Sequence, residues 1–191
     1  FQLTYESGKN ETYTPDELIS YLVESEWDEC YNRKLERTLN AAKFRYKASI
    51  ELLDYENNRL DKNQILRLAE CNFINRSENI IITGSTGIGK SYLASALGYQ
   101  ACSLGYRVGY HHSNKLYGKM KIAKADGSYM KELMRMEKQH VLILDDFGLQ
   151  PLDVQSRNML MEIIEDRHGK ASTIITSQVP ISSWHDIIGE Q

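Results

Sequence analysis

The sequence is poor in the features that define several classes of protein. It has three cysteines among its 191 residues, at positions 30, 71 and 102. This odd number, with wide spacing and no C-x-x-C pair, argues against a disulfide framework or a zinc site and indicates a reducing compartment. No apolar run approaches the roughly 18 residues of a membrane span, and no signal peptide is visible. We therefore expect a cytoplasmic protein with no membrane partner.

The sequence also lacks a strong net charge. The formal charge is −3 at pH 7, so no global field attracts nucleic acid, and any such surface must be local. Hydrophobic residues make up 41% of the chain and charged residues 26%, which is ordinary for a globular protein. The length predicts one α/β domain with a smaller appendage.

Metal-ligand and hydrolase patterns are missing as well. His111, His112 and His140 flank expected strands, and none has a spacing such as H-x-x-x-H. Structural or surface roles are therefore favoured over zinc binding. No Ser-His-Asp grouping has support from the sequence.

The clearest pattern begins near residue 80. Residues 80–82 are three isoleucines, typical of a strand buried on both faces. Residues 84–91 (Gly-Ser-Thr-Gly-Ile-Gly-Lys-Ser) then fit G-x-x-x-x-G-K-[ST]. An amphipathic segment with Leu93 and Leu97 follows, so the loop lies between a strand and a helix, as a phosphate-binding loop requires.

These residue types suit a polyphosphate. Glycines let backbone N–H groups converge on the anion, and the N-terminus of the next helix adds unpaired donors and partial positive charge. Lys90 would reach the β- and γ-phosphates, and the Ser91 hydroxyl would complete a Mg²⁺ shell. The predicted nucleotide-binding residues are Gly84, Ser85, Thr86, Gly87, Ile88, Gly89, Lys90, Ser91 and Tyr92.

A second informative stretch is a run of four apolar residues, 141–144, that ends in Asp145 and Asp146. In open α/β sheets, ligands bind at the carboxyl ends of the strands. Asp145 would hold Mg²⁺ with Ser91, and Asp146 stands where a carboxylate that polarises water is needed.

A further buried strand is expected at 172–177, and polar residues 176–178 at its end could sense the γ-phosphate and orient the attacking water. The pattern does not single out one of them. The candidate catalytic residues are Lys90, Asp145, Asp146 and Gln178. Other expected elements are a strand over 107–111 and helices over 61–70, 113–125, 153–169 and 184–188.

The amino-terminal part predicts two helices. Thr14, Pro15 and two acids form a strong helix start, and the first helix is expected to end near residue 29. A basic helix with aromatic residues is expected over 31–49. It could lie on a nucleic-acid backbone, or it could pair with the acidic helix before it.

A second basic segment lies within residues 115–124. An edge of the sheet that faces a polyanion would have this composition, and so would many exposed helices. Across both segments, the candidate DNA-binding residues are Arg33, Lys34, Arg37, Arg45, Lys119, Lys121 and Lys124.

Taken together, these motifs resemble the IstB/DnaC family of AAA+ ATPases, and more closely the IstB branch, the helper ATPases of insertion-sequence transposition. Beyond the two nucleotide motifs, the likeness extends over nearly the whole chain. The stretches that carry it are residues 43–50, 60–64, 84–98, 123–129, 144–148, 162–170 and 173–178.

The resemblance implies an AAA+ fold: a P-loop parallel sheet flanked by helices over residues 59–191, preceded by a small helical domain and linker over 1–58. It implies ATP and Mg²⁺ as cofactors, and assembly as a homo-oligomer on double-stranded DNA. It also implies recruitment or stimulation of a transposase. Asp146 falls at the position of the catalytic acid, where glutamate is commoner.

In AAA+ proteins an arginine of a neighbouring subunit and a C-terminal lid complete the site. The resemblance places both beyond residue 191, and Arg167 is a poor substitute for the arginine. We therefore expect these 191 residues to bind nucleotide but to hydrolyse it slowly alone.

Three alternatives stay open: a DnaC-like replicative helicase loader, a small-molecule P-loop kinase, and a nucleotide-gated DNA scaffold that does not hydrolyse ATP. The kinase would need an acceptor pocket and an arginine-rich lid, and neither is visible in the sequence.

Overall fold

The protein is described here from a computed structural model that covers residues 13–55 and 60–189. The chain divides into two compact units, residues 1–37 and 38–191. The predicted domain boundary near residue 58 lies outside the described residues and stays a prediction.

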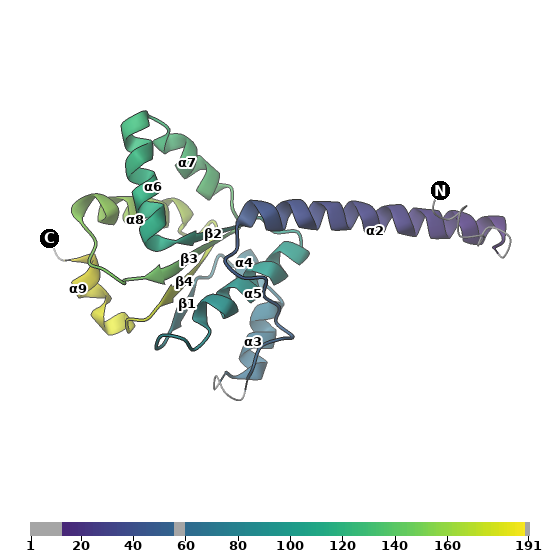
Figure 1. The fold of residues 1–191 in the computed structure, drawn as a ribbon, viewed down its shortest axis with the longest axis horizontal. Helices are drawn as coiled ribbons and strands as arrows, with labels where there is room; N and C mark the ends of the chain where they lie inside the picture. The colour runs from purple at the N-terminus through teal and green to yellow at the C-terminus, as the bar shows by residue number, and fades with distance from the viewer. Residues whose placement is uncertain (1–12, 56–59, 190–191) are drawn as a thin grey trace. The chain divides into compact units, whose positions relative to one another are not determined.

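A parallel sheet of four strands organises the second unit. The strands are β1 (Ile80–Thr83), β2 (Val108–His112), β3 (Val141–Phe147) and β4 (Ser172–Ser177). Their spatial order is β1-β4-β3-β2, and every neighbouring pair is parallel (Figure 1). The strands expected from the sequence and the parallel α/β class are therefore confirmed.

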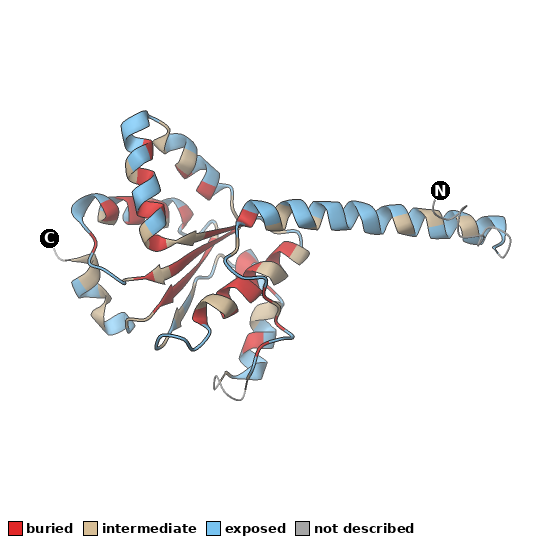
Figure 2. Cartoon of the chain, viewed as in Figure 1, coloured by how far each residue is buried: buried red, intermediate tan, exposed pale blue. Residues whose placement is uncertain are grey.

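Burial differs between the inner and outer strands. Residues 141–145 of β3 and all of β4 are buried, as continuous apolar or small-residue strands require (Figure 2). The prediction that residues 80–82 are buried on both faces is wrong, since Ile81 is 43% exposed. Along β1, an edge strand of the described sheet, partly buried and exposed residues alternate, so only one of its faces is covered.

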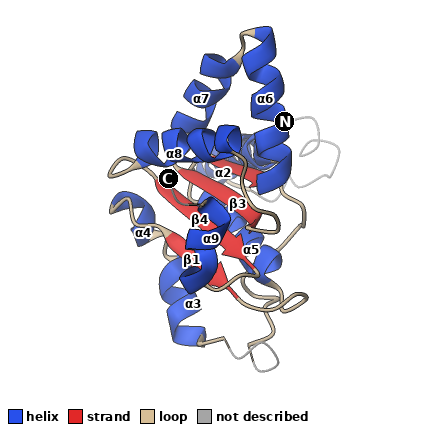
Figure 3. Cartoon of the chain, turned by 90° about the vertical axis from the view of Figure 1, so that its left-hand side faces the viewer, coloured by secondary structure: helices blue, strands red, loops and turns tan. Residues whose placement is uncertain are grey.

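Helices cover both faces of the sheet (Figure 3). On one face, α6 (Ser113–Asp126), α7 (Tyr129–Glu137) and α8 (Val154–Arg167) share a core with Leu142 and Leu144 of β3. On the other, α5 (Lys90–Ser103) packs against the strands. The remaining elements of this unit are α3 (Lys62–Ala69), α4 (Asn72–Asn75), η2 (Ile181–Ser183) and α9 (Trp184–Ile188).

Aspartate side chains cap two of the helices that the sequence predicts. Asp153 caps α8, because its carboxylate accepts a hydrogen bond of 2.8 Å from the backbone N–H of Ser156. Asp61 caps α3 in the same way.

The amino-terminal helices differ from the prediction. One helix, α2 (Pro15–Ala42), replaces the two expected over 15–29 and 31–49. No glycine or proline lies between residue 15 and residue 84, so nothing in the backbone ends a helix near residue 29. The helix ends instead at Ala42, where Lys43 adopts a φ of 60°. Arg45 therefore lies outside α2.

Over the described residues, no helix has the length and apolarity needed to cross a membrane.

Candidate nucleotide site

The phosphate-binding loop joins β1 to α5, as its sequence predicts. Gly87 and Gly89 have φ values of 84° and 87°, a left-handed conformation that favours glycine. No side chain caps the N-terminus of α5, so its first N–H groups are available to an anion. The buried Lys90 ammonium donates a hydrogen bond of 2.7 Å to the Ser85 carbonyl oxygen and so lies against the loop.

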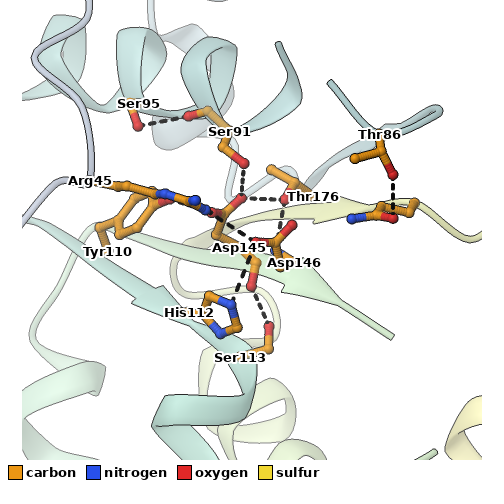
Figure 4. Close-up of polar contacts among 11 residues, drawn as sticks. Arg45, Thr86, Ser91, Ser95, Tyr110, His112, Ser113, Asp145, Asp146 and Thr176 are labelled. Carbon is orange, nitrogen blue, oxygen red and sulfur yellow. Dashed lines mark hydrogen bonds and ion pairs between the residues drawn. The ribbon is translucent and has the colours of Figure 1, made fainter. Parts of the chain in front are cut away.

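Asp145 is the most constrained carboxylate of the site. It is fully buried at the end of β3. Its Oδ1 accepts hydrogen bonds from Ser91 Oγ at 2.7 Å and Thr176 Oγ1 at 2.6 Å (Figure 4). Its Oδ2 accepts one from the Tyr110 hydroxyl. Burial and this bond raise the pKa of Tyr110, so the phenol stays a donor at neutral pH.

The predicted Mg²⁺ ligands are therefore adjacent. The Ser91 hydroxyl and the Asp145 carboxylate supply oxygen atoms from two elements that are far apart in sequence. Mg²⁺ prefers oxygen ligands and commonly takes one or two carboxylates together with substrate phosphates. No group of three or more His, Cys, Asp or Glu side chains that could hold a metal occurs in the described part of the chain. The donors present thus fit a nucleotide-bound Mg²⁺.

Asp146 has a left-handed backbone, with a φ of 56°, where the pairing of β3 with β4 shifts register. Adjacent residues of a regular strand point to opposite faces, and this conformation breaks the alternation. As a result, both carboxylates approach the same guanidinium: Arg45 Nη1 lies 3.3 Å from Asp146 Oδ2 and 3.8 Å from Asp145 Oδ2. His112 Nε2 lies 3.5 Å from Asp146 Oδ2.

The end of β4 contacts both halves of the site. Thr176 Oγ1 accepts a hydrogen bond of 3.0 Å from the Asp146 backbone N–H while it donates to Asp145. Gln178 Oε1 accepts one of 2.7 Å from Thr86 Oγ1 of the loop. The structure thus brings together every predicted catalytic residue. Thr176 links the two carboxylates, and Gln178 faces the phosphate-binding loop.

Two pockets flank the loop. One, of about 290 Å³, is lined by Lys90, Ser91, Asp146 and Gln178, among others, and by Arg45. The other, of about 440 Å³, is lined mainly by apolar residues that include Leu53, Leu60 and Ile88. Tyr92 lines both. A charged pocket beside a more apolar one is suited to the triphosphate and the base of a nucleotide.

Sequence reasoning missed four residues of this site. Arg45, Tyr110 and His112 contact the two carboxylates, and Ser113 Oγ donates a hydrogen bond of 3.0 Å to the backbone oxygen of Asp145. His112 is the last residue of β2 and pairs in register with Asp145, Ser113 follows it directly, and Tyr110 lies two residues before it on the same strand. Nothing in the sequence marks Arg45 as a residue of this site.

Most of the candidate DNA-binding residues make contacts within the chain. Lys119 pairs with Glu132, Lys121 pairs with Asp153, and Lys124 Nζ lies 4.7 Å from the centre of the Tyr129 ring. In the first unit, Arg33 Nη2 lies 2.9 Å from Glu26 Oε1, and Arg37 Nε donates to the Arg33 backbone oxygen.

Comparison with known proteins gives the family. The IstB-like ATP-binding protein family matches residues 2–191. A protein of Sinorhizobium fredii named as an insertion sequence ATP-binding protein, y4pL, is 42% identical over 96% of this chain and 75% of its own length. The protein of insertion sequence IS1162 of Pseudomonas fluorescens, also named as an ATP-binding protein, is 41% identical over 88% of this chain and 74% of its own.

Solved structures agree on the fold. The DnaC helicase loader has a TM-score of 0.66 at 24% identity, covering 78% of this chain and 91% of its own. The AMPPCP-bound DnaA of Aquifex aeolicus has a TM-score of 0.67 at 23% identity, covering 78% of this chain and 46% of its own. The sheet and loop therefore form an AAA+ fold of the DnaC and DnaA type. The chain belongs to the IstB-like family of insertion-sequence ATP-binding proteins.

Proposed function

We propose that this protein binds and hydrolyses Mg·ATP and uses the nucleotide to control its assembly on DNA during transposition. The observation that carries the ATPase part is the contact between the phosphate-binding loop and the end of β3. Ser91 Oγ lies 2.7 Å from Asp145 Oδ1, with Asp146 next to it in the same pocket wall.

Each residue has a part in this chemistry. Backbone N–H groups of the loop and the Lys90 ammonium bind the phosphates. Ser91 and Asp145 would hold Mg²⁺, which neutralises charge on the β- and γ-phosphate oxygens. Asp146 accepts a hydrogen bond from the attacking water and orients it, and Gln178 donates from its amide to the terminal phosphate or to that water.

ATP turnover tests this proposal. We expect Lys90→Ala to weaken ATP binding by about a hundredfold, since a charge-assisted contact to phosphate contributes roughly 2–3 kcal/mol. Asp146→Asn should bind ATP like the parent chain but lose most hydrolysis. Fluorescence titration with an ATP analogue and single-turnover phosphate release measure the two effects. Tight ATP binding by Lys90→Ala would contradict the proposed site.

A basic cavity supports the DNA part of the proposal. It measures about 630 Å³ and lies beside β2. Five cationic side chains line it, against Asp145 and Asp146 in the same lining: Lys43, Arg45, Lys115, Lys119 and Arg135. Lys115 and Arg135 line this cavity outside the ion pairs of Lys119 and Lys121, although Arg135 also acts on Glu132, and we expect both to contact phosphate groups.

The transposition part rests on the family, whose members carry names of insertion sequences. A transposase as partner and a homo-oligomer on double-stranded DNA are included in the proposal. The likeness to DnaC concerns the fold and does not favour helicase loading. Co-sedimentation of the full-length protein with DNA and its transposase, with ATP or ADP, tests both partners. Equal recovery with the two nucleotides would contradict nucleotide control.

A further inference from the structure

Arg45 belongs to no recognised nucleotide motif, yet it lies at the centre of the site. It lines the pocket beside the phosphate-binding loop together with Lys90 and Ser91. Its Nη1 atom contacts the carboxylate of Asp146 at 3.3 Å and approaches that of Asp145 at 3.8 Å (Figure 4). Half of its side chain is exposed, so the guanidinium also faces the open side of the pocket.

The backbone around Arg45 is anchored. The Phe44 ring stacks on Tyr99 at 4.7 Å between centroids and meets the edge of Tyr110 at 6.0 Å. Gly98 of α5 permits this approach, because a Cβ there would lie 2.5 Å from Phe44 Cε1. Ala48 is buried as well. The anchoring fixes where the Arg45 side chain starts, and its guanidinium, which lies 5.2 Å from the centre of the Tyr46 ring, is half exposed and can exchange partners by rotation of the side chain.

The charges of the pocket favour such an exchange. Among the residues that line it, Lys90 and Arg45 are the cations and Asp146 is the anion. A bound triphosphate would bring several negative charges next to Asp146. Guanidinium groups bind phosphate oxygens in a bidentate manner, so the terminal phosphate competes with the carboxylate for Arg45.

The geometry also indicates which phosphate is involved. Lys90 is at the start of α5 and serves the β- and γ-phosphates, while Asp146 orients the water that attacks the γ-phosphate. Because Arg45 contacts Asp146, a γ-phosphate bound next to Asp146 would lie closer to Arg45 than the phosphates that ADP retains.

We propose that Arg45, supplied by the same chain, binds the γ-phosphate of ATP and thereby releases Asp146 to orient the attacking water. This inference rests on the proposed ATPase function. With ADP bound, Arg45 stays paired with Asp146. Residues 43–50, which connect α2 to the rest of the nucleotide-binding unit, would in this way respond to the γ-phosphate.

Discrimination between ATP and ADP tests the proposal. We expect Arg45→Gln to weaken binding of a non-hydrolysable ATP analogue by about tenfold and to leave the Kd for ADP within about twofold. Single-turnover hydrolysis should fall by about tenfold or more, since the arginine also stabilises developing charge. Arg45→Lys should restore part of the ATP preference, because it keeps the charge without the planar fork.

Lys47→Gln is the matched control, since it removes the same charge from an exposed position two residues further along the same segment. It should leave both affinities unchanged. An equal loss of ATP and ADP affinity in Arg45→Gln, or no loss of either, would show that Arg45 only holds the carboxylates in place. Retained ADP binding establishes that the variant is folded.

The two proposals fail in different ways. If the parent chain binds no ATP, the proposed ATPase function is wrong. If the parent chain prefers ATP and Arg45→Gln keeps that preference in full, the nucleotide site stands and the role of Arg45 alone is refuted.

Discussion

The carboxyl-terminal end of β3 and the exposed side of α6 both hold charged residues, but in different ways. At the end of β3, the buried Asp145 carboxylate accepts three hydrogen bonds from three different elements. On α6, Lys119 and Lys121 each pair with one carboxylate and remain more than one-third exposed. Buried neighbours therefore hold the Asp145 carboxylate in one position, whereas the two lysines of α6 form single ion pairs that are open to solvent.

This difference shows for which charged residues the contacts can be predicted from the sequence. Parallel strands bring their carboxyl ends to one edge of a sheet, so Asp145 of β3 and Thr176 near the end of β4 lie together. Exposed lysines have no such constraint, and their partners depend on side chains that the sequence does not mark. Variants at buried and at exposed positions can therefore test the comparison directly.

The largest effect on stability is expected at Arg167, which is buried beneath β4. Its guanidinium donates to the backbone oxygens of Met136, Gln139 and Ser172 and to the Thr173 hydroxyl. Burial lowers the pKa of Arg167 to about 10, so at neutral pH the charge is present and these acceptors stabilise it. We expect Arg167→Gln to lower the free energy of unfolding by about 3 kcal/mol, because several buried carbonyls lose their donor.

Denaturant unfolding measures this loss. A change below about 1 kcal/mol would show that water or the new amide replaces those hydrogen bonds. These contacts indicate a structural role for Arg167, since the residue is only 3% exposed and its guanidinium points at backbone carbonyls of its own chain. The expectation that Arg167 is a poor substitute for an ATP-site arginine agrees with this placement.

A smaller effect is expected at Tyr110. Removing its hydroxyl leaves one oxygen of the buried Asp145 carboxylate without this donor. We expect Tyr110→Phe to cost about 1–2 kcal/mol of stability, because a buried carboxylate oxygen loses a hydrogen-bond donor. Tyr106→Phe is the matched control, since its hydroxyl bonds Asn75 at an exposed position.

Thermal unfolding measures the loss of stability in Tyr110→Phe and in Tyr106→Phe. The control should change the unfolding free energy by no more than about 0.5 kcal/mol. Equal effects in the two variants would contradict the view that burial at the end of β3 sets the strength of its contacts.

The sequence predicted the sheet and most of the nucleotide site, for physical reasons visible in particular residues. The glycines of the loop favour a left-handed backbone, and the apolar run 141–144 favours a fully buried strand. The position of the loop between an apolar run and an amphipathic segment predicts the strand–loop–helix order. The extra turns of α2 were missed because a change from acidic to basic side chains was interpreted as a boundary. Charge changes do not end a helix when neither glycine nor proline is present.

Arg45 could not have been assigned from its sequence context. It was expected on the basic stripe of a helix, but Phe44 leaves the helix to pack against Tyr99 and Tyr110. That packing is a tertiary contact across more than fifty residues, and no local propensity encodes it. Arg45 lines both the nucleotide pocket and the basic cavity beside β2, and its contact with DNA stays a prediction.

Measurements of DNA affinity can compare the cations of the cavity beside β2 with the lysines of α6 that already pair with carboxylates. We expect the double variant Lys115→Gln, Arg135→Gln to weaken binding to duplex DNA by about tenfold and to reduce the salt dependence by about two ions. Lys119→Gln with Lys121→Gln should have less than about a threefold effect, because both lysines already pair with carboxylates.

The control for this experiment is Arg67→Gln with Lys170→Gln, which removes two exposed charges that do not line the cavity. Fluorescence anisotropy over a range of salt concentrations measures all three variants in the full-length protein. A similar loss in all of them would indicate a general charge effect and would contradict a DNA contact in the cavity beside β2.

The smallest effect is expected for the exposed ion pair of the first unit. Arg33 and Glu26 are one heptad apart on α2, and their side chains are 61% and 71% exposed. Solvent and salt screen such a pair, and holding two long side chains in one geometry costs entropy. We expect Arg33→Gln to change the helix content of residues 13–42 by an amount that corresponds to less than about 0.5 kcal/mol. Circular dichroism at low and high salt measures it, and a large loss of helix at low salt would show that the ends of α2 depend on charge pairing as strongly as the end of β3 does.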